Sequence, residues 1–125
     1  MKREQEMVRE FHQKAGAWIS PGPCNMPNNV VVLRQNLIQE EVNELWDALD
    51  SENLVETADA IGDLLYVVLG TAVSCGIDIA PIFDEIHRSN MSKFIDGHRR
   101  EDGKWIKGPS YSPANLIPII DSQTH

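Results

Sequence analysis

The sequence predicts an all-α fold of four to five helices, and three observations support this. Apolar residues recur at helical spacing in long segments that lie between clusters of glycine and proline. No stretch alternates polar and apolar residues over enough positions to form a sheet. The chain has 125 residues, of which 42% are hydrophobic and 24% charged, as in a folded soluble protein. We therefore expect a single domain over residues 1–125, with an extended tail from about residue 96.

The predicted helices follow one another through the first 90 residues. The first has Met7, Val8 and Phe11 at helical spacing. Gly76 closes the third as a C-cap, and Pro81 lies just inside the start of the fourth. The expected helical segments are 2–14, 30–49, 54–75 and 78–90. Glycine and proline make the chain loop-like after residue 94, and residues 98–106 allow at most a small hairpin.

The formal net charge of −8 is unevenly distributed. Between Arg34 and Arg88 there are twelve acids and no Lys or Arg, whereas the rest of the chain carries a net +4. This balance argues against a nucleic-acid partner that is bound through general electrostatic attraction.

No secretory signal is visible at the N-terminus, and the run from Leu64 to Val73 is too short to span a membrane. The two cysteines, Cys24 and Cys75, form no zinc motif. We expect a cytoplasmic protein with reduced thiols and no membrane partner.

Several acids fall on the faces of the second and third predicted helices that should meet. Glu41 lies at the edge of the apolar stripe of the second helix, and Glu44 is one turn further. Asp63 interrupts an otherwise apolar third helix, which suggests that this helix is buried, and shares a face with Glu56 and Asp59.

The short turn at residues 50–53 predicts that these helices form an antiparallel hairpin. Glu41 then lies opposite Asp63, and Glu44 lies beside Asp59. The nearby sequence offers no Lys or Arg to neutralise the cluster, so a divalent cation would resolve the repulsion. Hard oxygen ligands favour Mg²⁺, or alternatively Mn²⁺.

A solvated charged face, or salt bridges to the basic ends, is the alternative interpretation. It is favoured for Asp47, Asp50 and Glu52, whereas metal binding is favoured for the cluster. Both interpretations stay open for Glu40 and Glu56.

Two motifs carry a resemblance to a known superfamily. Glu40-Glu41-Val42-Asn43-Glu44 resembles the EExxE motif of the all-α nucleoside triphosphate pyrophosphohydrolases, which include MazG-like enzymes, dimeric dUTPases and phosphoribosyl-ATP pyrophosphohydrolase. Residues 59–66 resemble the second motif, ExxD, with Asp63 in place of its Asp. Ala60 stands where that motif has Glu, so either Asp59 or Glu56 could supply the fourth ligand.

Downstream segments resemble the phosphoribosyl-ATP pyrophosphohydrolase-like branch, so that the similarity covers about residues 8–116. The resemblance implies Mg²⁺-dependent hydrolysis of a nucleoside triphosphate to a monophosphate and pyrophosphate. Glu41, Glu44, Asp63 and Asp59 would hold the metal, and Glu40 would orient or deprotonate the attacking water.

Residues outside the acidic segment are candidates for substrate binding. Lys93 is the first choice for the phosphates, although a solvated lysine at a helix end is an equal alternative. His12 could line a nucleobase pocket with Phe11 and Trp18, but a surface or capping histidine is the favoured interpretation. The remaining candidates are Asn36, Asn90, Lys104, Lys107 and Tyr111. For Lys104 and Lys107 a solvated tail lysine is the commoner interpretation, and for Tyr111 packing is slightly favoured over covering the site.

The first functional hypothesis is a pyrophosphohydrolase that removes unwanted nucleotides from the cellular pool. The alternatives are phosphoribosyl-ATP hydrolysis in histidine biosynthesis and a non-catalytic helical interaction module. Because two long helices cannot bury an apolar third helix alone, we also expect a homodimer or homotetramer.

Overall fold

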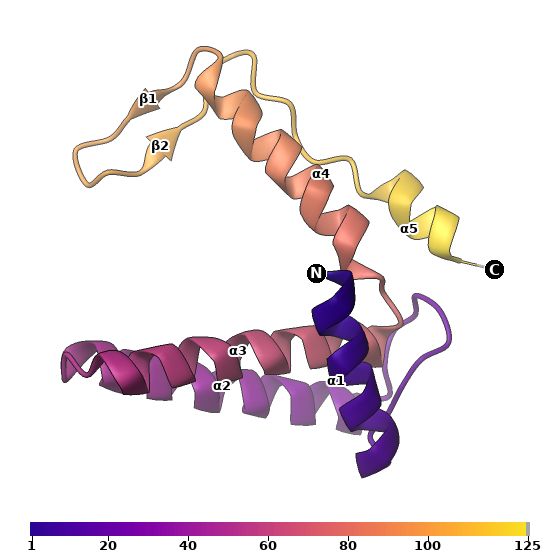
Figure 1. Ribbon diagram of the computed structural model, residues 1–125. Coiled ribbons are helices and arrows are strands. Elements are labelled where there is room, and N and C mark those ends of the chain that lie inside the picture. Colours follow the sequence, from indigo (N-terminus) through magenta and orange to yellow (C-terminus); the bar gives the residue numbers. More distant parts are fainter. Residues whose placement is uncertain (125) are drawn as a thin grey trace. The chain divides into compact units, whose positions relative to one another are not determined.

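The computed structural model describes residues 1–124 and confirms a mostly helical chain (Figure 1). Its internal contacts divide the chain into two compact units, Met1–Ile79 and Ala80–His125. His125, the last residue of the predicted tail, lies outside the described residues.

The first unit contains α1 (Lys2–Ala15), α2 (Asn28–Asp50) and α3 (Leu54–Cys75). Helices α2 and α3 lie side by side as an antiparallel hairpin, and α1 crosses α3 near its C-terminal end (Figure 1). The bounds of α3 are those predicted, whereas α2 begins two residues before the predicted start.

Local chemistry sets the ends of these helices. The Asn53 side chain accepts a hydrogen bond from the backbone N–H of Glu56 at 3.1 Å, which caps the start of α3. Gly16 and Gly76 end α1 and α3 with φ angles of 69° and 73°, in the left-handed region that glycine adopts most easily.

The core of the first unit lies where α1 crosses α3. Val8, Leu69 and Val73 are buried together, and Ile19 and Ile79 pack against them. Burial of apolar surface at this crossing is the main favourable term that holds α1 in place.

Helix α3 was expected to be fully buried only with a partner copy, and in the single chain most of its buried residues lie in its C-terminal half. Leu54, Val55 and Ile61 in the N-terminal half are 82%, 79% and 53% exposed in the single chain. Helix α3 also passes the length and hydropathy test for a membrane span, but core helices of soluble proteins pass the same test.

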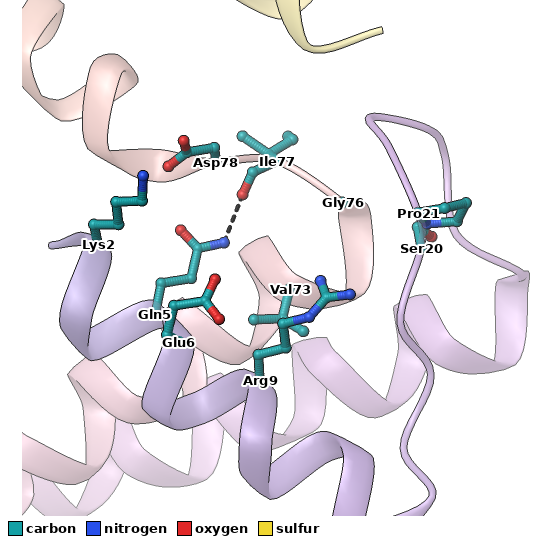
Figure 2. Close-up of a pocket in the computed structure, with 10 residues that line it drawn as sticks. All are labelled: Lys2, Gln5, Glu6, Arg9, Ser20, Pro21, Val73, Gly76, Ile77 and Asp78. Atoms are coloured by element: carbon teal, nitrogen blue, oxygen red, sulfur yellow. Dashed lines mark hydrogen bonds between the residues drawn. The ribbon is translucent and has the colours of Figure 1, made fainter. Parts of the chain in front are cut away.

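A glutamine fixes α1 to the segment that follows α3. Gln5 Nε2 donates to the carbonyl oxygen of Ile77 at 2.7 Å, and the Ile79 N–H donates to Gln5 Oε1 at 2.9 Å. The first of these bonds crosses a small polar cavity of about 170 Å³ (Figure 2). Gln5 therefore satisfies two backbone groups of the segment that follows α3.

His12 of α1 gives the first unit a predicted pH dependence. Burial lowers the pKa of its imidazole, and the positive charge of Arg34 lowers it further. A hydrogen bond with the Trp18 carbonyl raises the pKa in part. The unfolded chain binds the proton more readily, so the free energy of unfolding should fall as the pH decreases through 6.5. The slope is limited to about 1.4 kcal/mol per pH unit for one proton.

Urea unfolding between pH 7.5 and 5.5 would measure this slope. His12→Gln should flatten it, whereas His98→Gln, which changes an exposed histidine, should leave it unchanged. An unchanged slope in His12→Gln would show that other groups cause the pH dependence.

The second unit contains most of α4 (Ile79–Met91) and the rest of the chain. After a short 3₁₀ turn at Ser92–Phe94, strands β1 (His98–Arg99) and β2 (Trp105–Ile106) form the small antiparallel hairpin that the sequence allowed. The C-terminal region is irregular, as predicted, and α5 (Ile117–Gln123) is a short helix near its end. Pro118 lies in the first turn of α5, where a missing N–H costs nothing, so it can begin a helix as well as break one.

Polar contacts hold the tail to α4 within this unit. Glu85 accepts two hydrogen bonds from Arg88 and one from the backbone N–H of Asn115 at 2.7 Å. These contacts lower the pKa of Glu85 to about 2. Arg88 also donates to the Ser112 hydroxyl and to the Pro113 carbonyl.

Candidate metal centre

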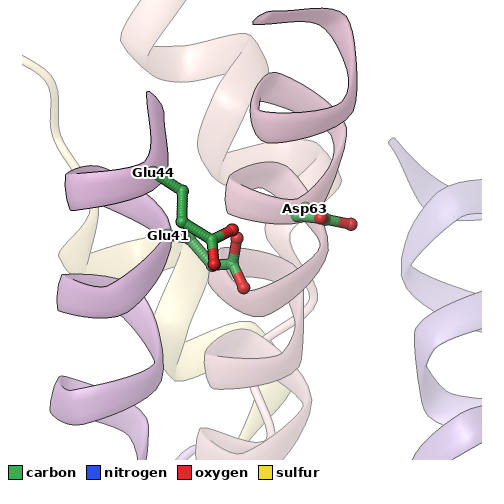
Figure 3. Close-up of side chains that lie close together, drawn as sticks. All are labelled: Glu41, Glu44 and Asp63. Carbon is green, nitrogen blue, oxygen red and sulfur yellow. The ribbon is translucent and has the colours of Figure 1, made fainter. Parts of the chain in front are cut away.

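Three carboxylates lie together between α2 and α3. Glu41 and Glu44 extend from adjacent turns of α2, and Asp63 extends from α3 (Figure 3). One carboxylate oxygen from each residue lies within 4.8 Å of the other two. The hairpin geometry predicts this convergence, because residues at equal distances from the turn face each other.

Glu41 is the most constrained member of the cluster. Its Oε2 atom is buried and has no hydrogen-bond partner among the described residues. The pKa of Glu41 is raised first by burial and then by a hydrogen bond with the Glu44 side chain. The charges of Glu44, Asp63 and Glu40 raise it further. A buried carboxylate oxygen without a partner is costly, and a divalent cation would supply the missing contact. The donor set therefore fits a cation.

The distribution of charged residues around the cluster also favours a bound cation. None of the ion pairs within residues 1–124 involves the three carboxylates. Arg34 is the only basic residue on α2, and its guanidinium bonds to Thr71 and to the Val67 carbonyl instead. Three carboxylates without a basic partner form the oxygen-rich site that hard divalent cations prefer.

The other acids predicted as ligands lie around the cluster. Glu56 and Asp59 line a cavity of about 440 Å³ together with Glu44 and the exposed Asp47. Glu40 is exposed on α2, and its charge acts on Glu41. The three-carboxylate cluster includes none of these residues. Their roles as ligands or as a base stay predictions.

Four of the predicted substrate-binding residues lie together in the second unit. Lys93, Lys104, Lys107 and Tyr111 line one cavity of about 290 Å³. The ammonium group of Lys107 lies 4.8 Å from the centre of the Tyr111 ring, and that of Lys93 lies 5.9 Å from it. Such cation–π contacts orient the lysines in the cavity.

The same cavity has a wall that sequence reasoning missed. Trp105 lines it, and the indole N–H of Trp105 donates to the carbonyl oxygen of Lys93 at 2.8 Å. Strand pairing places this residue, and the only signal in the sequence was the short hairpin pattern. Asn90, also predicted to bind substrate, is exposed at the end of α4.

The remaining candidates lie in the first unit. His12 is buried rather than on the surface, with Nδ1 3.3 Å from the Trp18 carbonyl oxygen, which corrects the favoured interpretation. It fits there because Gly70 of α3 has no side chain, and a Cβ at Gly70 would lie 3.0 Å from His12 Nε2. Asn36 is exposed on α2.

Comparisons with known proteins agree with the two carboxylate motifs. The family model of phosphoribosyl-ATP pyrophosphohydrolase matches residues 8–90, which include α2, α3 and the three carboxylates. The protein L479 of Acanthamoeba polyphaga mimivirus is 53% identical over 49 residues. This segment is 39% of the present chain and 20% of the length of that relative.

Proposed function

The chain belongs to the phosphoribosyl-ATP pyrophosphohydrolase family, and from this premise we propose that it hydrolyses a (deoxy)nucleoside triphosphate to a monophosphate and pyrophosphate. The family indicates a pyrophosphohydrolase, and the nature of the nucleotide is our proposal. The observation that carries it is the cluster of Glu41, Glu44 and Asp63 around a buried oxygen that has no partner.

The cluster suits the electrostatic demands of this reaction. A polyphosphate is repelled by carboxylates unless a cation lies between them, and a divalent ion held by the three residues would neutralise and orient it. We propose Mg²⁺, with Mn²⁺ as a substitute, because the ligands are all carboxylate oxygens. Asp59 or Glu56 would complete the ligand set from the neighbouring cavity.

The remaining roles are part of the same proposal. Glu40 precedes the ligand Glu41 and is exposed, so it can accept a proton from the attacking water. Hydrolysis of the bond between the α- and β-phosphates then leaves a nucleoside monophosphate and pyrophosphate. Lys93, Lys104 and Lys107 line one cavity and would bind the phosphate oxygens.

Phosphoribosyl-ATP is the second candidate substrate, because it gives the matched family its name. The same bond is hydrolysed in both cases, and the carboxylate cluster would hold the divalent cation in both. Only the part of the substrate beyond the triphosphate differs between the two candidates.

We also propose a cytoplasmic homodimer or homotetramer. The exposed apolar residues Leu54, Val55 and Ile61 lie on the helix that carries Asp63, so a second copy could cover them. A strictly monomeric chain in light scattering would contradict this proposal.

The test of the proposed function is a screen for pyrophosphate release. The chain is incubated with Mg²⁺ and canonical nucleotides, modified nucleotides and phosphoribosyl-ATP in parallel, and then again with Mn²⁺. We expect release from at least one of them and none in the presence of EDTA. Absence of release from all of them would support the non-catalytic interaction module instead.

A further inference from the structure

A buried arginine in the first unit forms no ion pair with any residue that the structure describes. Arg34 is the only Lys or Arg between Lys14 and Arg88, and its side chain is only 7% exposed. Its Nε donates to the Thr71 hydroxyl at 3.2 Å and its Nη2 to the Val67 carbonyl at 2.7 Å, so both partners are neutral. Within residues 1–124, no carboxylate forms an ion pair with it and Nη1 donates no hydrogen bond. A buried charge in this state is costly unless an anion compensates it.

Arg34 lines a cavity of about 290 Å³ that is separate from the carboxylate cluster. The cavity lies where the loop after α1 meets the start of α2 and the end of α3. Its lining also includes Trp18, which is half exposed, and Asn29. No acidic residue lines it, although the chain as a whole is strongly acidic. The residues that line the cavity therefore include a cation, an amide and an aromatic residue.

The wall of this cavity is held rigidly. The Ser74 hydroxyl donates to the Trp18 carbonyl oxygen at 2.9 Å, and the indole N–H of Trp18 donates to the Ser20 hydroxyl at 3.1 Å. Gly70 leaves room for the guanidinium, because a Cβ there would overlap Nη2 of Arg34. Because these bonds already hold the Trp18 side of the cavity, less conformational entropy is lost there when a ligand binds.

We propose that this cavity binds a phosphate monoester group, with the Arg34 guanidinium and the Asn29 amide as its donors. A guanidinium fork matches phosphate oxygens, and a neutral, partly apolar wall strengthens the attraction. Trp18 is available to pack against the organic part of the ligand.

The position of the cavity relates it to the proposed active site. Arg34 precedes Glu41 by seven residues on α2, so the two share a helix face about 10 Å apart along the axis. This separation suits a second phosphate at the far end of a substrate whose triphosphate lies at the carboxylates. This use of the cavity rests on the proposed function, whereas phosphate binding itself does not.

Binding can be measured without metal or catalysis. In a chain carrying Trp46→Phe and Trp105→Phe, Trp18 is the remaining tryptophan and lines the cavity. In the presence of EDTA, we expect ribose 5-phosphate and inorganic phosphate to change its fluorescence in a saturable way, and ribose to have no effect. Asn29→Asp keeps the shape of an exposed side chain but adds a repelling charge, and should weaken phosphate binding at least about tenfold.

The matched control is Asn43→Asp, which adds the same charge to an exposed position of α2 that does not line the cavity. It should bind phosphate like the parent chain. Arg34→Lys keeps the charge without the fork and should weaken binding, and circular dichroism would verify its fold. No saturable response, equal weakening by both Asp variants, or a response to ribose as strong as to ribose 5-phosphate would overturn the proposal.

A kinetic comparison distinguishes a phosphate group of the substrate from the phosphate group of a separate ligand. If it belongs to the substrate, Asn29→Asp should lower kcat/KM for phosphoribosyl-ATP more than for ATP. If it belongs to a separate ligand, the two values should change equally. Should no nucleotide be hydrolysed at all, the proposed function fails and the metal-free titration still decides whether the cavity binds phosphate.

Discussion

Replacing Glu41 by Gln should reduce Mg²⁺-dependent pyrophosphate release by more than about 100-fold, because even residues that only support metal ligands cost about 10- to 100-fold when they are changed. Glu41 has the buried oxygen without a partner, and the neighbouring carboxylates raise its pKa. The amide keeps the shape of the side chain but cannot supply a charged ligand. The chain should therefore fold normally and lose the cation.

Although Glu41→Gln should lower activity, it should not lower the stability of the metal-free chain. Without metal, Glu41→Gln removes a charge that Glu44 and Asp63 repel, so the melting temperature of the metal-free chain should stay the same or rise. Added Mg²⁺ should raise the melting temperature of the parent chain but not that of the variant. Lower activity with higher metal-free stability is typical of a functional site rather than a structural one.

Two further variants complete this test. Asp63→Asn should behave like Glu41→Gln, since it removes the ligand that α3 contributes. Asp50→Asn removes an exposed charge from the same helix as Glu41 and should keep both the activity and the response to Mg²⁺. Normal activity in Glu41→Gln would contradict the assignment of the cluster.

The carboxylate cluster was predictable because it depends on local rules. Helical periodicity placed Glu41 and Glu44 on one face of α2, and the length of the turn at residues 50–53 fixed the position of Asp63 across the hairpin. Neither step needs information about distant parts of the chain. The bounds of α3 were predictable for the same reason, with an Asn cap at one end and a Gly cap at the other.

The environment of His12 and Arg34 was not predictable in this way. Each residue lies on an amphipathic helix where its own neighbours in sequence allow a surface position. Both are buried because α3 lacks a side chain at Gly70, where residues from α1, α2 and α3 meet. These three helices are separate segments of the sequence. The periodicity of one helix cannot report such a contact. The position of α5 was not predicted because proline breaks a helix in its interior but is well tolerated in its first turn. Pro118 lies in the first turn of α5, and the sequence alone does not distinguish the two cases.

Replacing Gly76 by Ala should destabilise the first unit by about 3 kcal/mol or more, the largest effect on stability that we expect from a single methyl group. An L-residue in the left-handed region costs about 1–2 kcal/mol by itself, and the φ angle of Gly76 is 73°. A Cβ there would also overlap the carbonyl group of Gly22 and lie 2.9 Å from the carbonyl oxygen of Ser20. Backbone atoms cannot turn aside as a side chain can, so the loop must move.

Gly16 provides a matched control for this prediction. It also ends a helix, and its φ angle of 69° is nearly the same, but no atom lies within 4 Å of the Cβ that alanine would add. Gly16→Ala should therefore lower the free energy of unfolding by only about 1–2 kcal/mol, the conformational part alone. Urea unfolding of both variants separates the two contributions. The difference between them measures how tightly residues 20–22 pack against the end of α3, where the N–H of Cys24 also bonds to the Cys75 carbonyl at 3.0 Å. Equal destabilisation of the two variants would mean that the loop yields freely and that α3 ends without its support.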